Sequence, residues 1–152
     1  MKLEWLLERQ LAWISQADSK LSVLGPLPLA MLAISFTKLP LNLAELDWAD
    51  FPIVVSAILL ALCLFFVKAA LSPRLTGPAN SLVYFGGISK ISSEEFAKRI
   101  EGSNDALFRD DILTQIHVNA RIAEQKHRSI GLSVLWLALA TPFWLLAIVT
   151  GS

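Results

Sequence analysis

The chain has 152 residues, of which 55% are hydrophobic and only 17% charged, with a mean hydropathy of +0.57. Soluble domains carry about 25% charged residues, so this composition favours a membrane protein. Thirteen basic residues balance thirteen acidic ones, which argues against a nucleic-acid polymer as partner. The single cysteine, Cys63, excludes an intramolecular disulfide and argues against a cysteine-based zinc site.

Residues 1–20 are predicted to form a cytoplasmic amphipathic helix. One arc of its helical wheel is apolar and the opposite arc is polar. The apolar arc contains Leu3, Leu6, Leu7, Leu11, Trp13, Ile14 and Ala17. The charges within this segment do not follow the basic-then-apolar order of a cleavable signal peptide.

Three stretches carry no charged residue, at residues 21–37, 51–67 and 129–152. They predict three membrane spans, at residues 21–37, 51–71 and 129–150. Seventeen helical residues cover about 25 Å of a core of about 30 Å. Flanking lysines can supply the difference, because their ammonium groups reach the headgroups. A soluble bundle would require polar outer faces, which these segments lack. Pro26 and Pro28 interrupt the first span, and we favour a tolerated kink there over a functional hinge.

The distribution of basic residues predicts the orientation. The segment between the first two spans, residues 38–50, contains only Lys38 as a basic residue, whereas the other twelve lie in 1–20 and 68–128. The positive-inside rule therefore places residues 1–20 and 72–128 in the cytoplasm and 38–50 in an outer hairpin. The expected fold is an all-α membrane protein of one domain, residues 1–152, with about three transmembrane helices, the N-terminal helix and a helical cytoplasmic insert.

The cytoplasmic insert, residues 72–128, shows clear helix boundaries. Ser92 and Glu95 match a capping box that opens a short helix, which Gly102 is placed to end. A second helix should begin at Asp105 and continue without Gly or Pro into the third span.

This second helix carries an apolar stripe that comprises Ile112, Leu113, Ile116, Ala120 and Ala123. A row of polar residues is predicted beside it, formed by Gln115, Asn119 and Lys126. Such a row of polar residues forms either the wall of a pocket or a boundary row that hydrogen-bonds to the 72–90 loop. The helical periodicity does not distinguish these two interpretations.

The residues resemble a known family in an ordered set of short motifs. The first group comprises Trp13-Ile14, Ala17-Asp18, Lys20 and Gly25, and the second comprises Ser72-Pro73-Arg74, Asn80 and Phe85-Gly86-Gly87-Ile88. The third is the run from Asp111 to Lys126. Together they resemble the transmembrane Pycsar effectors (PycTM-like), bacterial anti-phage membrane proteins.

The resemblance implies how such a protein acts. A partner cyclase makes a cyclic pyrimidine mononucleotide, cCMP or cUMP, upon infection. The effector senses this nucleotide and impairs the inner membrane, so that growth stops or the cell dies before phage release. No cofactor is implied, and three spans per chain suggest a homo-oligomer.

Such a ligand needs a cation for its phosphate, amides for the edge of the base and an aromatic face for stacking. Arg74 and Lys126 are the candidate cations. The candidate amides are Asn80, Gln115 and Asn119, and the candidate stacking residues are Trp13, Tyr84 and Phe85. Ordinary roles compete with each of these: basic residues can anchor to headgroups, Phe85 can belong to the core, and Trp13 can lie at the interface.

An enzyme is the less favoured class. His117 and His127 lie ten residues apart without metal-ligand spacing. The charge-free stretches contain no ionisable group of the kind expected for intramembrane catalysis. We therefore expect no catalytic residue and no metal site. A passive membrane subunit or scaffold stays open as the alternative.

Overall fold

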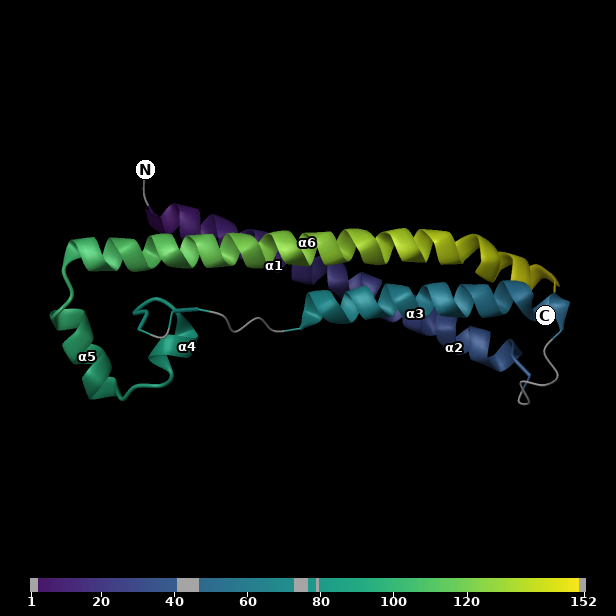
Figure 1. Cartoon of the computed structure of the whole chain (residues 1–152), viewed down its shortest axis with the longest axis horizontal. Coiled ribbons are helices and arrows are strands. Elements are labelled where there is room, and N and C mark those ends of the chain that lie inside the picture. Colours follow the sequence, from purple (N-terminus) through teal and green to yellow (C-terminus); the bar gives the residue numbers. More distant parts are fainter. Residues whose placement is uncertain (1–2, 41–46, 73–76, 79, 151–152) are drawn as a thin grey trace. The chain divides into compact units, whose positions relative to one another are not determined.

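The computed structural model describes residues 3–40, 47–72, 77–78 and 80–150, and throughout these residues the regular elements are helices (Figure 1). The elements in chain order are α1 (Leu3–Leu24), α2 (Pro26–Lys38), the 3-10 helix η2 (Trp48–Asp50), α3 (Phe51–Leu71), α4 (Phe85–Ile88), α5 (Ser93–Glu101) and α6 (Asp105–Thr150).

Three helical stretches are long and apolar enough to cross a bilayer: Leu3–Lys38, Trp48–Leu71 and Asp105–Thr150. Each contains one of the spans predicted from the charge-free segments. The expected all-α membrane fold is therefore confirmed. The predicted outer hairpin, residues 38–50, lies partly outside the described residues.

The chain divides into two compact units. Met1–Gln16 and Pro73–Gln125 form one, which we call the polar unit, and Ala17–Ser72 and Lys126–Ser152 form the other, the apolar unit. Two helices, α1 and α6, contribute residues to both units.

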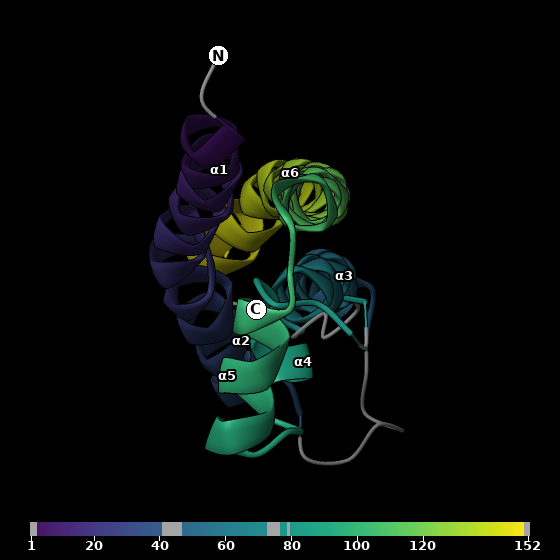
Figure 2. The same cartoon turned by 90° about the vertical axis from the view of Figure 1, so that its left-hand side faces the viewer.

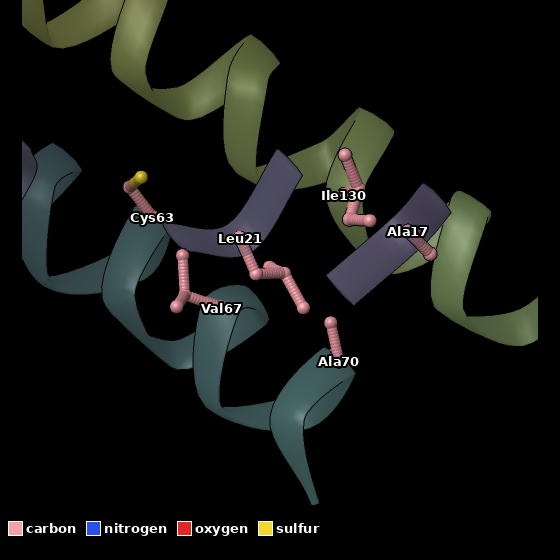
Figure 3. Close-up of a cluster of buried hydrophobic side chains, with 6 residues drawn as sticks. All are labelled: Ala17, Leu21, Cys63, Val67, Ala70 and Ile130. Atoms are coloured by element: carbon pink, nitrogen blue, oxygen red, sulfur yellow. The ribbon is translucent and has the colours of Figure 1, made fainter. Parts of the chain in front are cut away.

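Helices α1, α3 and α6 meet in the core of the apolar unit (Figure 3). Small and larger side chains alternate there, and small residues let membrane helices approach closely. The buried cluster comprises Ala17, Leu21, Cys63, Val67, Ala70 and Ile130. A second cluster joins α2, α3 and α6 through Met31, Leu60 and Ala140.

The helical backbone continues across the boundary between α1 and α2. Gly25 has right-handed helical dihedral angles, φ −77° and ψ −59°, and its N–H donates to the Leu21 carbonyl at 2.9 Å. Pro26 and Pro28 lack the N–H groups that the next helical bonds would need. Pro28 is fully buried, so the interruption is packed into the apolar unit. The tolerated kink that we favour and the alternative of a hinge both stay predictions.

In the polar unit, α4 and α5 lie on the same side of the first turns of α6 (Figures 1 and 2). Ser92 caps α5 by accepting from the Glu95 N–H, as predicted, and Gly102 follows its last residue. The reciprocal half of the predicted capping box is replaced, because the Glu95 carboxylate accepts from Arg99 Nε at 2.9 Å. The prediction of one continuous helix from Asp105 into the third span is confirmed by α6.

Close packing around Tyr84 holds the segment before α5. The Tyr84 ring is buried, and a Cβ atom added at Gly77 or Gly86 would lie 2.5–2.7 Å from its atoms. Contacts this short cannot exist, so glycine is required at both positions for the ring to occupy this place.

Neighbouring elements cover only part of each predicted apolar face. Leu11 and Trp13 lie on the apolar arc of α1 and are exposed. Leu113, assigned to the packed stripe of α6, is exposed as well. A helical wheel identifies an apolar arc, but the neighbouring elements determine which part of it they cover.

We expect Gly86→Ala to destabilise the polar unit by about 1–3 kcal/mol, because the new methyl group must displace the buried Tyr84 ring. Thermal unfolding of the detergent-solubilised protein, followed by circular dichroism, measures this. Gly131→Ala in α6 is the matched control, since a Cβ atom there has no neighbour within 4 Å. Equal melting temperatures for the two variants would contradict the packing argument.

Candidate functional site

A cavity of about 690 Å³ lies within the polar unit, between the residues before α4, the end of α5 and the early turns of α6. Its volume is in the range of ligand-binding pockets, about 300–1,000 Å³. Pro78, Leu82, Gly102 and Leu107 form its apolar wall. Its polar lining comprises Asn80, Ser81, Arg99, Ser103, Asp110, Asp111 and Thr114.

Hydrogen bonds fix the walls of this cavity. The Asp111 carboxylate accepts from the Leu82 N–H at 2.6 Å, which fastens the residues before α4 to α6. The Ser81 hydroxyl accepts from the N–H groups of Val83 and Tyr84 at 3.1 and 2.8 Å. These bonds satisfy backbone donors in a segment that has no helix of its own.

Arg99 supplies the guanidinium group of the cavity. Its Nε donates to the Glu95 carboxylate one turn earlier on α5, which orients the side chain. A guanidinium carries five N–H donors, so the two terminal nitrogens keep their capacity to bind an anion.

Gln115 and Asn119, two of the sequence-predicted binding residues, form a buried pair on α6. They are 7% and 6% exposed, and Gln115 Nε2 donates to Asn119 Oδ1 at 3.2 Å. Gln115 Oε1 is buried without a hydrogen-bond partner among the described residues. An acceptor left in this state is costly.

The location of this pair corrects one expectation. Gln115 and Asn119 were predicted to run beside the packed stripe, yet they form its centre together with Ile112 and Ala123, the other buried residues of this part of α6. The opposite face of α6 is exposed at His117, Arg121, Glu124 and Arg128.

Lys126, the third residue of the predicted row, lies in the apolar unit. Its ammonium group forms an ion pair with the Asp18 carboxylate of α1. The side chain of Lys126 is 12% exposed and that of Asp18 48%. The pair therefore connects the two long helices within the apolar unit.

The remaining predicted residues have separate surroundings. Among the predicted residues that the structure describes, Asn80 is the one that lines the cavity. Tyr84 is buried between glycines, whereas Phe85 is exposed and contacts it, with ring centroids 4.9 Å apart. Trp13 is exposed on α1, where the Arg9 guanidinium lies 5.7 Å from its ring centroid. Arg74 lies outside the described residues.

Sequence reasoning did not single out Arg99, Asp110 or Asp111 as functional residues. Arg99 has an ordinary position in a short charged helix, and its relation to α6 depends on the turn at residues 102–104. The sequence did contain one indication for Asp111, because this residue begins the third motif of the family resemblance, the run from Asp111 to Lys126. Among the described residues, no group of three or more histidine, cysteine, aspartate or glutamate side chains could hold a metal ion.

We expect Asp111→Ala to open the cavity wall, because the Leu82 N–H loses its acceptor at a cost of about 1–3 kcal/mol. Amide hydrogen exchange of the segment 81–84 should become faster. Asp111→Asn keeps an acceptor oxygen and should exchange much more like the original protein. Unchanged protection in Asp111→Ala would show that the bond does not hold this segment.

Comparison with known proteins gives one family. The Pycsar effector protein domain, PycTM, matches residues 2–151, essentially the entire chain. No curated protein and no solved structure matches the chain. The match agrees with the ordered motifs quoted above and with the three helical stretches that can span a membrane. The chain therefore belongs to the Pycsar effector family, and its role is that of a membrane effector in anti-phage defence.

Proposed function

We propose that this protein senses a cyclic pyrimidine mononucleotide, cCMP or cUMP, and in response impairs the bacterial inner membrane, so that growth stops or the cell dies. The polar unit is the receptor and faces the cytoplasm, where the nucleotide is made by a partner cyclase. The apolar unit acts on the lipid bilayer. The N-terminus lies on the cytoplasmic side, as the distribution of basic residues favours.

The observation that supports this proposal most strongly is the cavity of the polar unit. It combines a guanidinium group, an amide and hydroxyl groups with an apolar wall of Leu82, Leu107 and Pro78. A cyclic nucleotide presents matching features: one negative phosphodiester, a ribose hydroxyl and a flat base. Arg99 is suited to the phosphodiester and Asn80 to the edge of the base.

Gln115 and Asn119 are proposed as further ligand-responsive residues. The Gln115 acceptor has no partner among the described residues, so an N–H donor that reached it would remove an energetic cost. Because both amides are nearly fully buried, such a contact requires the packing of the polar unit to change. Ligand binding would then favour a second arrangement of the unit.

Two helices offer a route from receptor to membrane. α1 and α6 contribute to both units, and α6 has no Gly or Pro between Asp105 and Ile130. The ion pair between Lys126 and Asp18 joins these same helices. A ligand that binds one arrangement more tightly shifts the population of that arrangement by its differential affinity.

The damage to the membrane requires more than one copy. Three helical stretches per chain can span a bilayer, and three helices enclose too little space to line a pore. We therefore propose a homo-oligomer. A passive membrane subunit is the competing function, and it differs in predicting no response to any nucleotide. We propose no enzymatic activity.

The proposal predicts a nucleotide-dependent loss of membrane potential in bacteria that produce the protein. A potential-sensitive dye should report depolarisation when cCMP or cUMP is supplied by a co-expressed cyclase, but not with a purine cyclase. In parallel, the detergent-solubilised protein should melt at a higher temperature with the active nucleotide, because the ligand binds only the folded state. No depolarisation and no thermal shift with either pyrimidine nucleotide would sink the proposal.

Gln115→Ala and Lys126→Ala should abolish depolarisation or weaken it strongly, the first by removing the buried amide and the second by breaking the ion pair with Asp18. Gln125→Ala and Arg128→Ala are the matched controls, since both residues are exposed on the same helix. A passive subunit would tolerate all four substitutions equally, provided that the variants accumulate to similar levels in the membrane.

A further inference from the structure

We propose that the apolar unit has a second arrangement, in which the indole N–H of Trp136 donates to the backbone carbonyl of Leu24. The change between the two arrangements takes place at the bend from Gly25 to Pro28, where α1 gives way to α2. This inference goes beyond the sensing of a nucleotide, because it assigns a moving contact within the membrane-spanning part of the chain. It follows from an unpaired donor and an acceptor without its usual donor in one part of the core.

The donor is the indole N–H of Trp136 on α6. Its nitrogen atom is buried and has no hydrogen-bond partner among the described residues. Trp136 packs against the buried cluster of α1, α3 and α6 (Figure 3). The bilayer core offers neither water nor an acceptor, so this group bears the full cost of losing its hydration. An arrangement that pairs the N–H therefore gains a hydrogen bond that the described arrangement lacks.

The acceptor is the carbonyl of Leu24, the last residue of α1. In a continuous helix this carbonyl accepts from the N–H of the residue four positions later, which here is Pro28 and has no N–H. Leu24 packs against the same buried cluster as Trp136. The unpaired donor and the acceptor without its usual donor thus belong to one part of the core, on two different helices.

A neighbouring bond indicates that the register of the helices is suitable. Trp144 Nε1 donates to the Met31 carbonyl at 3.1 Å. The first helical stretch and α6 run in the same direction, because their residue numbers rise together from the first buried cluster to the second. Leu24 precedes Met31 by about two helical turns, and Trp136 precedes Trp144 by about two as well. An indole of α6 can therefore reach a carbonyl of α1 there once the bend changes.

The bend itself is the part of the first stretch that is held by the fewest helical hydrogen bonds. Pro26 and Pro28 each lack the N–H of a helical residue. Gly25 has no side chain, and a Cβ atom there would lie 3.2 Å from the Leu21 carbonyl oxygen. The sequence alone favours a tolerated kink at this place, whereas the unpaired indole favours movement. Because Pro28 is fully buried, a change at the bend repacks the core.

The second arrangement gains one hydrogen bond and gives up part of the packing around the bend. Such opposing changes make a two-state element, in which a small differential interaction is sufficient to shift the populations. Ligand binding elsewhere in the chain is one such interaction. The nucleotide-free protein should therefore already contain the second arrangement as a minor state.

Nuclear magnetic resonance of the full-length, detergent-solubilised protein, with ¹⁵N-labelled tryptophan indoles, tests the inference. Hydrogen bonding moves an indole proton downfield, so the signal of Trp144 should lie downfield of the signal of Trp136. Chemical exchange saturation transfer should reveal a minor state of Trp136 with a downfield-shifted proton. Its population should rise when cCMP or cUMP is added. Loss of the signal in Trp136→Phe establishes the assignment.

Pro28→Ala supplies the N–H that the Leu24 carbonyl lacks, so this variant should lose the minor state of Trp136. Pro142→Ala is the matched control and should keep the minor state, since Pro142 lies inside α6 and outside the bend. Circular dichroism establishes whether each variant retains its fold.

A second comparison does not depend on the proline variants. Trp144→Phe should lower the melting temperature by about 2–4 °C more than Trp136→Phe. The reason is that the Trp144 indole donates to Met31, whereas the Trp136 indole nitrogen has no partner in the described part of the chain.

A single state of Trp136 under all conditions, paired or unpaired, overturns the inference. A minor state that persists in a folded Pro28→Ala variant overturns Leu24 as the acceptor. Equal melting temperatures for the two tryptophan variants overturn the difference in pairing on which the inference depends. Failure of the proposed function looks different: neither nucleotide would raise the melting temperature, while a minor state in the nucleotide-free protein would still support the second arrangement.

Discussion

Lipid offers no hydrogen-bond partner to an unpaired backbone or side-chain group, and this constraint organises the apolar unit. Its three buried serines form hydrogen bonds within their own helices. Ser35, Ser56 and Ser133 are fully buried, and each hydroxyl donates to a carbonyl three or four residues earlier, at 2.8–2.9 Å. Such bonds cost the helix little and expose nothing polar to lipid.

Other polar side chains of the apolar unit likewise donate to backbone carbonyls. Pro142 lies inside α6, and the adjacent Thr141 hydroxyl donates to the Leu137 carbonyl at 2.8 Å. Beyond the prolines of α2, the Trp144 indole donates to the Met31 carbonyl at 3.1 Å and so ties α6 to α2. The polar bonds between helices are few, and packing of small and branched side chains does the remaining work.

The polar unit is not under this constraint, because water can pair with polar groups at its surface. Short helices and loops can therefore form its walls. Side-chain caps set its geometry: Ser92 opens α5 and the Asn104 amide oxygen accepts from the Leu107 N–H at the start of α6. Asp111 then fixes the segment before α4 across a sequence separation of 29 residues. The two caps set where α5 and α6 begin, and the bond to Asp111 joins two parts of the cavity wall.

Local features of this protein could be predicted from the sequence and tertiary ones could not. The spans were predicted from the length of the charge-free stretches. The Ser92 cap predicted α5, and the absence of Gly and Pro after Asp105 predicted α6. Each of these signals depends only on residues that are close together in the sequence. The buried centre of α6 depends on what covers it, so Gln115 and Asn119 proved to be its core while Leu113 is exposed. The cavity combines Asn80, Arg99 and Asp110 from three elements, and no periodicity relates them.

Two long helices, α1 and α6, contribute residues to both units, and the positions of their interruptions follow one pattern. α6 contains no break between its cavity-lining turn at Asp111 and Ile130 in the membrane core. α1 meets its break only at Gly25, beyond Ala17 and Leu21. The interruptions at Gly25 and Pro142 therefore lie beyond the ion pair between Asp18 and Lys126 and beyond the buried side chains Leu21 and Ile130, so this part of the apolar unit packs as uninterrupted helix.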